Sequence, residues 1–303
     1  MREFNTSATC FPEIHYTVLR KELIKVGKKQ VEKGRYFTIF APRQAGKTTY
    51  FELLFKEFTN TNIKPVHLRF GNMSKMNTEG FYRALDYKLH REIADYEVKI
   101  NLTIKDPLDI ERVFDEIKKL SISILLVIDE FEGIPECVQN EFMHTLRDMY
   151  HQKKRHALHS LILVGVSTVV ELSTSSASPF NVTDEIQVPY FTREEVDDLI
   201  GQYTSETGHE FDEDVIRTIY QNTNGQPGLV CALCKHLVEK VATDKNKPVS
   251  MKNFYKTQDY FLTEKFDKNI LNIVSKAKNK KDFMLKLLFS DKPVTFTVDD
   301  EDI

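Results

Sequence analysis

The stretch that decides the expected fold is Ala41-Pro42-Arg43-Gln44-Ala45-Gly46-Lys47-Thr48. The β-forming run of residues 36–40 comes before it, and apolar side chains at helical spacing follow it over residues 51–58. A glycine-containing turn between a strand and a helix presents backbone N–H groups at the positive end of the helix, where they can surround a phosphate. The sequence therefore predicts a phosphate-binding loop rather than an ordinary strand–turn–helix corner.

This loop has an expected set of contacts with a nucleotide. We expect the Lys47 ammonium to bridge the β- and γ-phosphates, and the Thr48 hydroxyl to bind Mg²⁺. Ala41 stands where such loops usually have their first glycine, and it is small enough to take that place. The residues expected to bind the nucleotide through this loop are Gln44, Ala45, Gly46, Lys47, Thr48 and Thr49.

An acidic pair, Asp129-Glu130, follows the apolar run of residues 124–128. Open α/β sheets place their active sites at the carboxyl ends of their strands. We expect Asp129 to hold Mg²⁺ through water and Glu130 to polarise the attacking water. Taken alone, such a pair usually marks a solvated turn, but here it comes about 80 residues after a phosphate-binding loop, which favours the catalytic interpretation.

A third apolar run, residues 161–166, ends in the hydroxyl residues Ser167 and Thr168. If this strand lies between the other two, one of these hydroxyls would approach the γ-phosphate or the attacking water. The alternative is a core strand that ends in a small polar turn.

The expected fold class is α/β, a three-layer αβα P-loop NTPase fold with a parallel sheet. The runs at residues 124–128 and 161–164 are continuously apolar, which is typical of strands covered on both faces. Up to Pro189, strand-like segments alternate with helical ones, whereas the segments after it have helical patterns. The first of these helices begins with a capping box at Thr192 and Glu195.

We expect three domains. Residues 1–189 form the nucleotide-binding domain, residues 190–245 a helical lid, and residues 246–303 a C-terminal helical extension. Whether the extension is the beginning of a winged helix that a longer protein completes is left open.

Composition excludes several classes of protein. Among 303 residues, 42 Lys and Arg oppose 45 Asp and Glu, so the net charge is −3 and a mainly electrostatic binder of nucleic acid or membranes is not expected. No apolar run reaches the length of about 18 residues that a membrane helix needs. Together with the charge balance, this predicts a protein without membrane contact. Four cysteines in a chain of this length make no disulfide framework, so we expect a cytoplasmic protein.

Two cysteines, Cys231 and Cys234, resemble half of a zinc site with His236 nearby. A zinc site needs about four ligands, and no second pair exists. Because leucines interleave these thiols at helical spacing, we expect them to be core residues without a metal. Basic stretches at residues 25–33, 153–155 and 276–281 are interpreted mainly as solvated surface, with nucleic-acid contact kept as an alternative.

Together these motifs resemble a known family. The Gly46-Lys47-Thr48 and Asp129-Glu130 segments look like the Walker A and Walker B motifs of the P-loop ATPases that have an additional strand and a catalytic glutamate. The runs of residues 4–16 and 35–49 resemble the bacterial AAA-like domain family, which is close to the archaeal-type and STAND ATPases. Residues 224–230 resemble the glycine-proline lid motif of that group.

The resemblance implies roles for three further residues. Pro227 would pack near the base and sugar and sense the γ-phosphate, and His15 and Tyr16 would contact adenine. From the sequence alone, Pro227 is equally well explained as the first residue of a helix, and His15 and Tyr16 as ordinary packing residues. For an arginine finger, nothing singles out one of Arg43, Arg147 and Arg155.

The expected function is ATP binding and Mg²⁺-dependent hydrolysis to ADP and phosphate, serving as a nucleotide-dependent switch. A protein partner or self-association is expected. Two alternatives stay open: a nucleotide-binding interaction scaffold that scarcely hydrolyses ATP, and a DNA-associated helper ATPase.

Overall fold

The structure is a computed structural model, and it describes the whole chain except residues 8, 41–43, 166–183, 265–276, 279–280 and 291–303. Its contacts divide the chain into two compact units. The sheet unit comprises the described residues of Ser7–Pro12 and Thr17–Tyr190. The helical unit comprises Met1–Thr6, Glu13–Tyr16 and the described residues from Phe191 onward. Each unit is considered by itself below.

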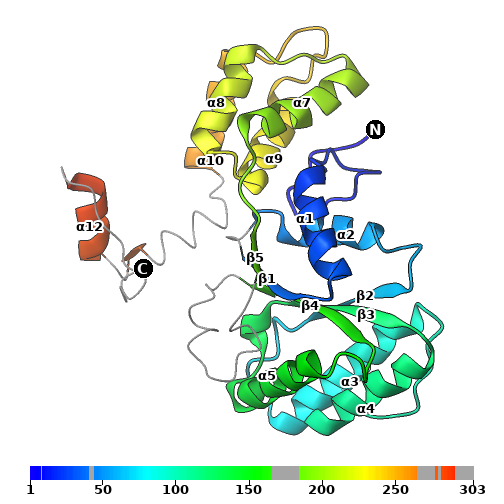
Figure 1. Cartoon of the computed structure of the whole chain (residues 1–303). Helices are drawn as coiled ribbons and strands as arrows, with labels where there is room; N and C mark the ends of the chain where they lie inside the picture. The colour runs from blue at the N-terminus through cyan, green and yellow to red at the C-terminus, as the bar shows by residue number, and fades with distance from the viewer. Residues whose placement is uncertain (8, 41–43, 166–183, 265–276, 279–280, 291–303) are drawn as a thin grey trace. The chain divides into compact units, whose positions relative to one another are not determined.

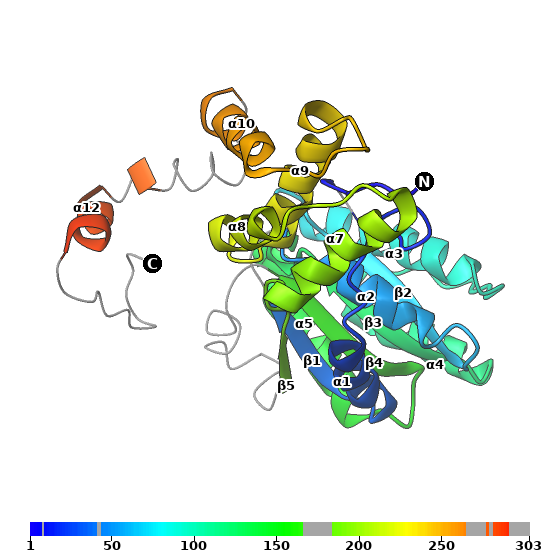
Figure 2. The same cartoon turned by 90° about the horizontal axis from the view of Figure 1, so that it is seen from above.

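The sheet unit is built on five parallel strands in the order β2-β3-β4-β1-β5, which Figure 2 shows side by side. The strands are β1 Tyr36–Phe40, β2 Ile63–Arg69, β3 Ser123–Asp129, β4 Leu158–Gly165 and β5 Asp184–Gln187. The expected parallel sheet is confirmed. The third apolar run lies between the other two, because β4 pairs with β1 on one side and with β3 on the other.

Helices cover both faces of this sheet (Figure 1), as the continuously apolar strands predicted. They are α1 Lys21–Glu32, α2 Lys47–Lys56, α3 Thr78–Ala94, α4 Pro107–Lys119 and α5 Glu136–His151. Strand β3 shows why both faces are apolar: Leu125 and Val127 belong to the core cluster with α2, and the alternate residue Leu126 to the cluster with α3, α4 and α5. All three side chains are buried.

Strand β2 is an edge of the sheet, and its sequence limits pairing with another strand. Pro65 has no N–H to donate, and its carbonyl oxygen accepts a hydrogen bond of 2.6 Å from the Tyr96 hydroxyl. Both features reduce the number of backbone groups that this edge presents.

The helical unit contains α7 Arg193–Thr207, α8 Glu213–Thr223, α9 Pro227–His236 and α10 Met251–Thr263, with α12 Lys281–Phe289 later in the chain. A π-helical turn, η2 Leu237–Val241, follows α9. The turn predicted between α8 and α9 is confirmed: Asn224 and Gly225 both have left-handed backbones, with φ of 47° and 71°. Cys231 and Cys234 are buried in α9, as expected of core residues.

Part of the N-terminal segment groups with the helical unit, whereas the sequence predicts that residues 1–189 form one domain. Phe4 and Tyr16 are buried in the helical unit against Tyr203 of α7, with 5.5 Å between the ring centroids of Phe4 and Tyr203. Lys235 of α9 also pairs with Glu3 at 2.7 Å. Aromatic burial and this ion pair explain why the segment groups with the helices.

Within the described part of the chain, no helix is both long and apolar enough to cross a membrane.

The predicted capping box at the start of α7 is present and can be tested. The Glu195 N–H donates to the Thr192 hydroxyl oxygen at 3.2 Å, and the Glu195 carboxylate accepts from the Thr192 N–H at 3.0 Å. Thr192→Ala should lower the free energy of unfolding by about 1 kcal/mol. The control, Ser205→Ala at an exposed position of the same helix, should change it by less than about 0.5 kcal/mol. Equal losses in a denaturant titration would contradict a capping role for Thr192.

Candidate functional site

The loop that precedes α2 has the backbone expected of a phosphate-binding turn. Gly46 has a φ of 90°, which favours glycine, and Gln44 also lies in the left-handed region with a φ of 58°. A Cβ added at Gly46 would meet no described atom within 4 Å, so the backbone conformation, rather than crowding, requires glycine here. Residues 41–43 of the predicted loop lie outside the described residues.

The start of α2 fits an anion. Lys47 is the first residue of the helix, and Gly46 has no side chain with which to cap its first N–H groups. These groups and the helix dipole favour negative charge at this end. Lys47 and Thr48 are half-buried. The Thr49 hydroxyl oxygen accepts a hydrogen bond of 3.1 Å from the Cys10 N–H, so it anchors the segment of residues 7–12 to α2.

The acidic pair lies at the carboxyl end of β3, and its two members differ in burial. Asp129 is only 6% exposed, whereas Glu130 is exposed. The Glu130 N–H donates to Asp129 Oδ1 at 2.9 Å, and Glu130 has a left-handed backbone with a φ of 56°. Such a conformation is uncommon for a residue other than glycine and is often found at functional sites. It ends the strand immediately after the buried carboxylate.

The sheet order brings the loop and the acidic pair to the same edge. In a parallel sheet all carboxyl ends point the same way, and β1, which leads into the loop, is separated from β3 by β4 alone. Ligands of open α/β sheets bind at this edge. Ser167 and Thr168, which follow β4, lie outside the described residues, so their role stays a prediction.

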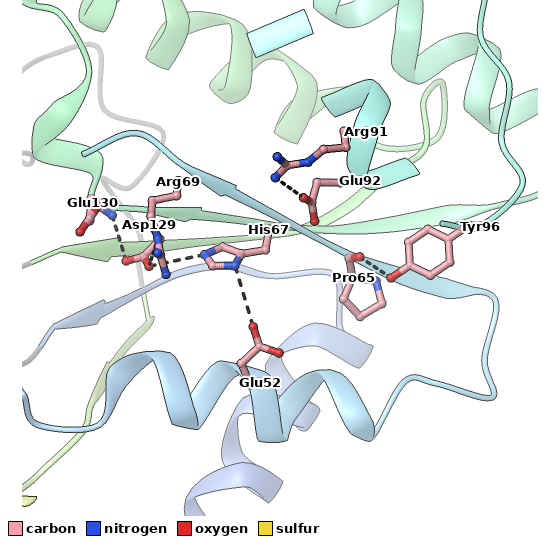
Figure 3. A network of polar contacts seen from close by, with 9 residues as sticks. All are labelled: Glu52, Pro65, His67, Arg69, Arg91, Glu92, Tyr96, Asp129 and Glu130. Atoms are coloured by element: carbon pink, nitrogen blue, oxygen red, sulfur yellow. Dashed lines mark hydrogen bonds and ion pairs between the residues drawn. The ribbon is translucent and has the colours of Figure 1, made fainter. Parts of the chain in front are cut away.

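Two residues that the sequence patterns did not single out contact the buried carboxylate (Figure 3). His67 Nε2 lies 3.4 Å from Asp129 Oδ2, and Arg69 Nε lies 3.6 Å from the same oxygen. His67 Nδ1 also lies 3.9 Å from Glu52 Oε1 of α2. Burial raises the pKa of Glu52, and the nearby His67 opposes that rise. The sequence signal that could have pointed to His67 and Arg69 is their alternation along β2 with the apolar, buried residues Val66 and Leu68.

Both oxygens of the Asp129 carboxylate have polar neighbours. Its Oδ1 accepts from the Glu130 N–H, and its Oδ2 faces His67 and Arg69. Oxygen donors of this kind suit a hard cation, and the Thr48 hydroxyl is the second donor of the predicted set. Among the described residues, no group of three or more His, Cys, Asp or Glu could hold a metal by itself. A Mg²⁺ ion here would need phosphate oxygens or waters as further ligands.

The residues expected near adenine and the sugar lie in the helical unit. Tyr16 is 1% exposed, and the Arg2 guanidinium lies 4.9 Å from its ring centroid. Burial raises the pKa of Tyr16 to about 12. His15 faces Glu3 at 4.0 Å, and Pro227 is the buried first residue of α9. These positions agree with packing roles, and the contacts with adenine and sugar stay predictions.

A sequence profile described as the AAA-like domain matches residues 16–247, which is well over half of the chain. The chain belongs to the AAA-like domain family. The resemblance found in the sequence motifs is thereby confirmed. No curated protein sequence matches the chain.

Three solved structures with similar folds are distant from this chain in sequence. The Walker-type ATPase of Pyrococcus abyssi is 13% identical with a TM-score of 0.67, over 94% of this chain and 82% of that one. The Aeropyrum pernix ORC1 protein in complex with DNA is 14% identical with a TM-score of 0.57, over 96% and 75%. The Thermotoga maritima RuvB Holliday junction branch migration motor is 14% identical with a TM-score of 0.53, over 89% and 75%. These similarities establish the P-loop NTPase fold.

Two glycines beside the acidic pair give a test of this geometry. A Cβ at Gly71 would overlap the Glu130 carboxylate, the end of a flexible side chain, whereas a Cβ at Gly133 would overlap the Phe70 backbone. Gly71→Ala should therefore displace Glu130 and change the free energy of unfolding by less than about 1 kcal/mol. Gly133→Ala should lower it by about 1–3 kcal/mol, because backbone must move. Denaturant titrations that give equal losses for both variants would contradict the described positions of these side chains.

Proposed function

We propose that this protein binds ATP with Mg²⁺ and hydrolyses it to ADP and phosphate, and that the bound nucleotide acts as a switch. The single observation that carries the proposal is the sheet order. It brings a loop with a left-handed Gly46, followed directly by Lys47, to the same edge as the buried carboxylate of Asp129. Family membership supports the same chemistry.

The phosphates would be bound by the chain at the start of α2. Backbone N–H groups of Gln44, Ala45 and Gly46 would surround the β-phosphate, and the Lys47 ammonium would reach the β- and γ-phosphates. Thr48 and Asp129 would hold Mg²⁺, and the bound ion would neutralise part of the negative charge of the phosphates.

The two carboxylates suit two different tasks. Asp129 is buried, its Oδ1 accepts a hydrogen bond, and its Oδ2 lies near His67, which suits a group that must keep a metal in one place. Glu130 is exposed and stands just past the strand, which suits a group that orients a water and takes its proton. Ser167 and Thr168 are proposed to orient the same water or the γ-phosphate.

The switch role is supported by the division into two units. The chain passes from the helical unit to the sheet unit and back within its first 16 residues, and Thr49, next to the proposed Mg²⁺ ligand Thr48, binds the segment of residues 7–12. We propose that nucleotide binding changes the helical unit through this segment and through Pro227. A partner protein or a second copy of the chain would respond to that change.

A DNA-associated ATPase is the second candidate. The observation that favours it is the fold similarity to the ORC1 protein in complex with DNA and to the RuvB branch migration motor. Phosphate release by the full chain, measured with and without duplex DNA at several salt concentrations, separates the candidates. Stimulation that fades with salt would favour the DNA-associated role. Equal rates would favour a protein partner, and no release under any condition would favour the interaction scaffold.

Glu130→Gln tests the proposed reaction directly. It removes the proton acceptor but keeps the size of the side chain, so phosphate release should fall at least about 100-fold while ATP affinity changes little. Glu132→Gln, at an exposed position two residues later, is the matched control and should retain the wild-type rate. Equal release from wild type and Glu130→Gln would contradict the role assigned to Glu130.

A further inference from the structure

A cavity of about 280 Å³ lies between strand β2 and helix α3, beside the acidic pair but lined by neither of its members. The residues that line this β2–α3 pocket are His67, Arg69, Lys88, Arg91 and Glu92. Sites for whole small molecules usually measure about 300–1,000 Å³, so a pocket of about 280 Å³ is at the lower end of that range and has room for one anionic group.

The lining is strongly cationic. Among the lining residues, Arg69, Lys88 and Arg91 oppose Glu92, so their fixed charges sum to 3 − 1 = +2. Asp129, which is not part of the lining, lies 3.6 Å from Arg69 and offsets part of this charge. Glu92 pairs with Arg91 at 3.0 Å. Figure 3 shows Arg91 and Glu92 on α3 across from His67 and Arg69 on β2. Gathering like charges on one concave surface is unfavourable unless an anion offsets them.

Much of this positive charge has no counterpart in the described part of the chain. No described carboxylate lies within 4.0 Å of the Lys88 ammonium. Arg69 approaches Asp129 only through Nε, at 3.6 Å, and its terminal NH₂ groups have no hydrogen-bond partner among the described residues. The donors that face the pocket are therefore available to a ligand.

The donor set favours phosphate over other anions. Guanidinium groups match the geometry of phosphate oxygens with two parallel hydrogen bonds, and an ammonium adds a point charge. A phosphate monoester carries about −1.5 to −2 charges near neutral pH, so it brings more negative charge to this cationic lining than a single carboxylate does.

We propose that the β2–α3 pocket binds one phosphate group, as free phosphate or as a phosphate monoester, through Arg69, Lys88 and Arg91. None of the phosphate-binding loop residues lines it, so it is a second anion site, and it does not depend on ATP hydrolysis. Arg69 also contacts Asp129, so the ligand would share this side chain with the candidate nucleotide site.

The test is calorimetric titration of the full-length chain with inorganic phosphate and, separately, with phenyl phosphate as the monoester probe. Arg91→Gln and Lys88→Gln each remove one charged donor and should weaken binding at the pocket at least about tenfold. Arg83→Gln is the matched control, because Arg83 is an exposed arginine of α3 that does not line the pocket. It should bind as wild type does.

The phosphate-binding loop is unchanged in all these variants, so its own uptake of the probe is common to them. Thermal unfolding of each variant confirms that it is folded. Binding of both probes would show that the pocket accepts a monoester, and binding of inorganic phosphate alone would identify free phosphate as the ligand. Equal affinity and stoichiometry for wild type, Arg91→Gln and Arg83→Gln would overturn the proposal, as would the loss of all binding in Lys47→Ala.

Discussion

The parallel arrangement of the sheet is the constraint on which the rest of the structure depends. Because β4 is inserted between β1 and β3, two segments far apart in the chain end at one edge of the sheet. Helices on both faces keep the strands buried and so require the continuously apolar runs. The chemistry of the candidate site can then be carried by the few residues just past the strand ends, where side chains need not serve the core.

Electrostatics at this edge follow from burial. The Asp129 carboxylate lies in a buried position where a lone charge would be costly, and contacts with the Glu130 N–H, His67 and Arg69 offset that cost. His67 and Arg69 also line the β2–α3 pocket. Strand β2 therefore has two parts in this region: it contacts the Asp129 carboxylate, which is the proposed Mg²⁺ ligand, and it lines a cationic cavity.

Sequence patterns predicted the parts of the site that are local in the chain. The turn at Gly46 and the pair Asp129-Glu130 are each defined by a few neighbouring residues. His67 and Arg69 could not be found in this way, because their contact with Asp129 arises from the pairing of β2 with β3, in which Arg69 stands opposite Asp129. The packing of the N-terminal segment on α7 could not be predicted for a related reason, because it depends on aromatic rings that are distant in the sequence.

In the proposed function, the loop before α2 and the carboxylate of Asp129 form one site for ATP and Mg²⁺. Equilibrium binding of ATP to the full-length chain, measured with and without Mg²⁺, tests it most directly. We predict saturable binding of one ATP per chain that Mg²⁺ strengthens, and loss of this binding in Lys47→Ala, which removes the proposed phosphate-bridging ammonium. Binding that is unaffected by Lys47→Ala, or the absence of saturable binding to the wild-type chain, would contradict the account.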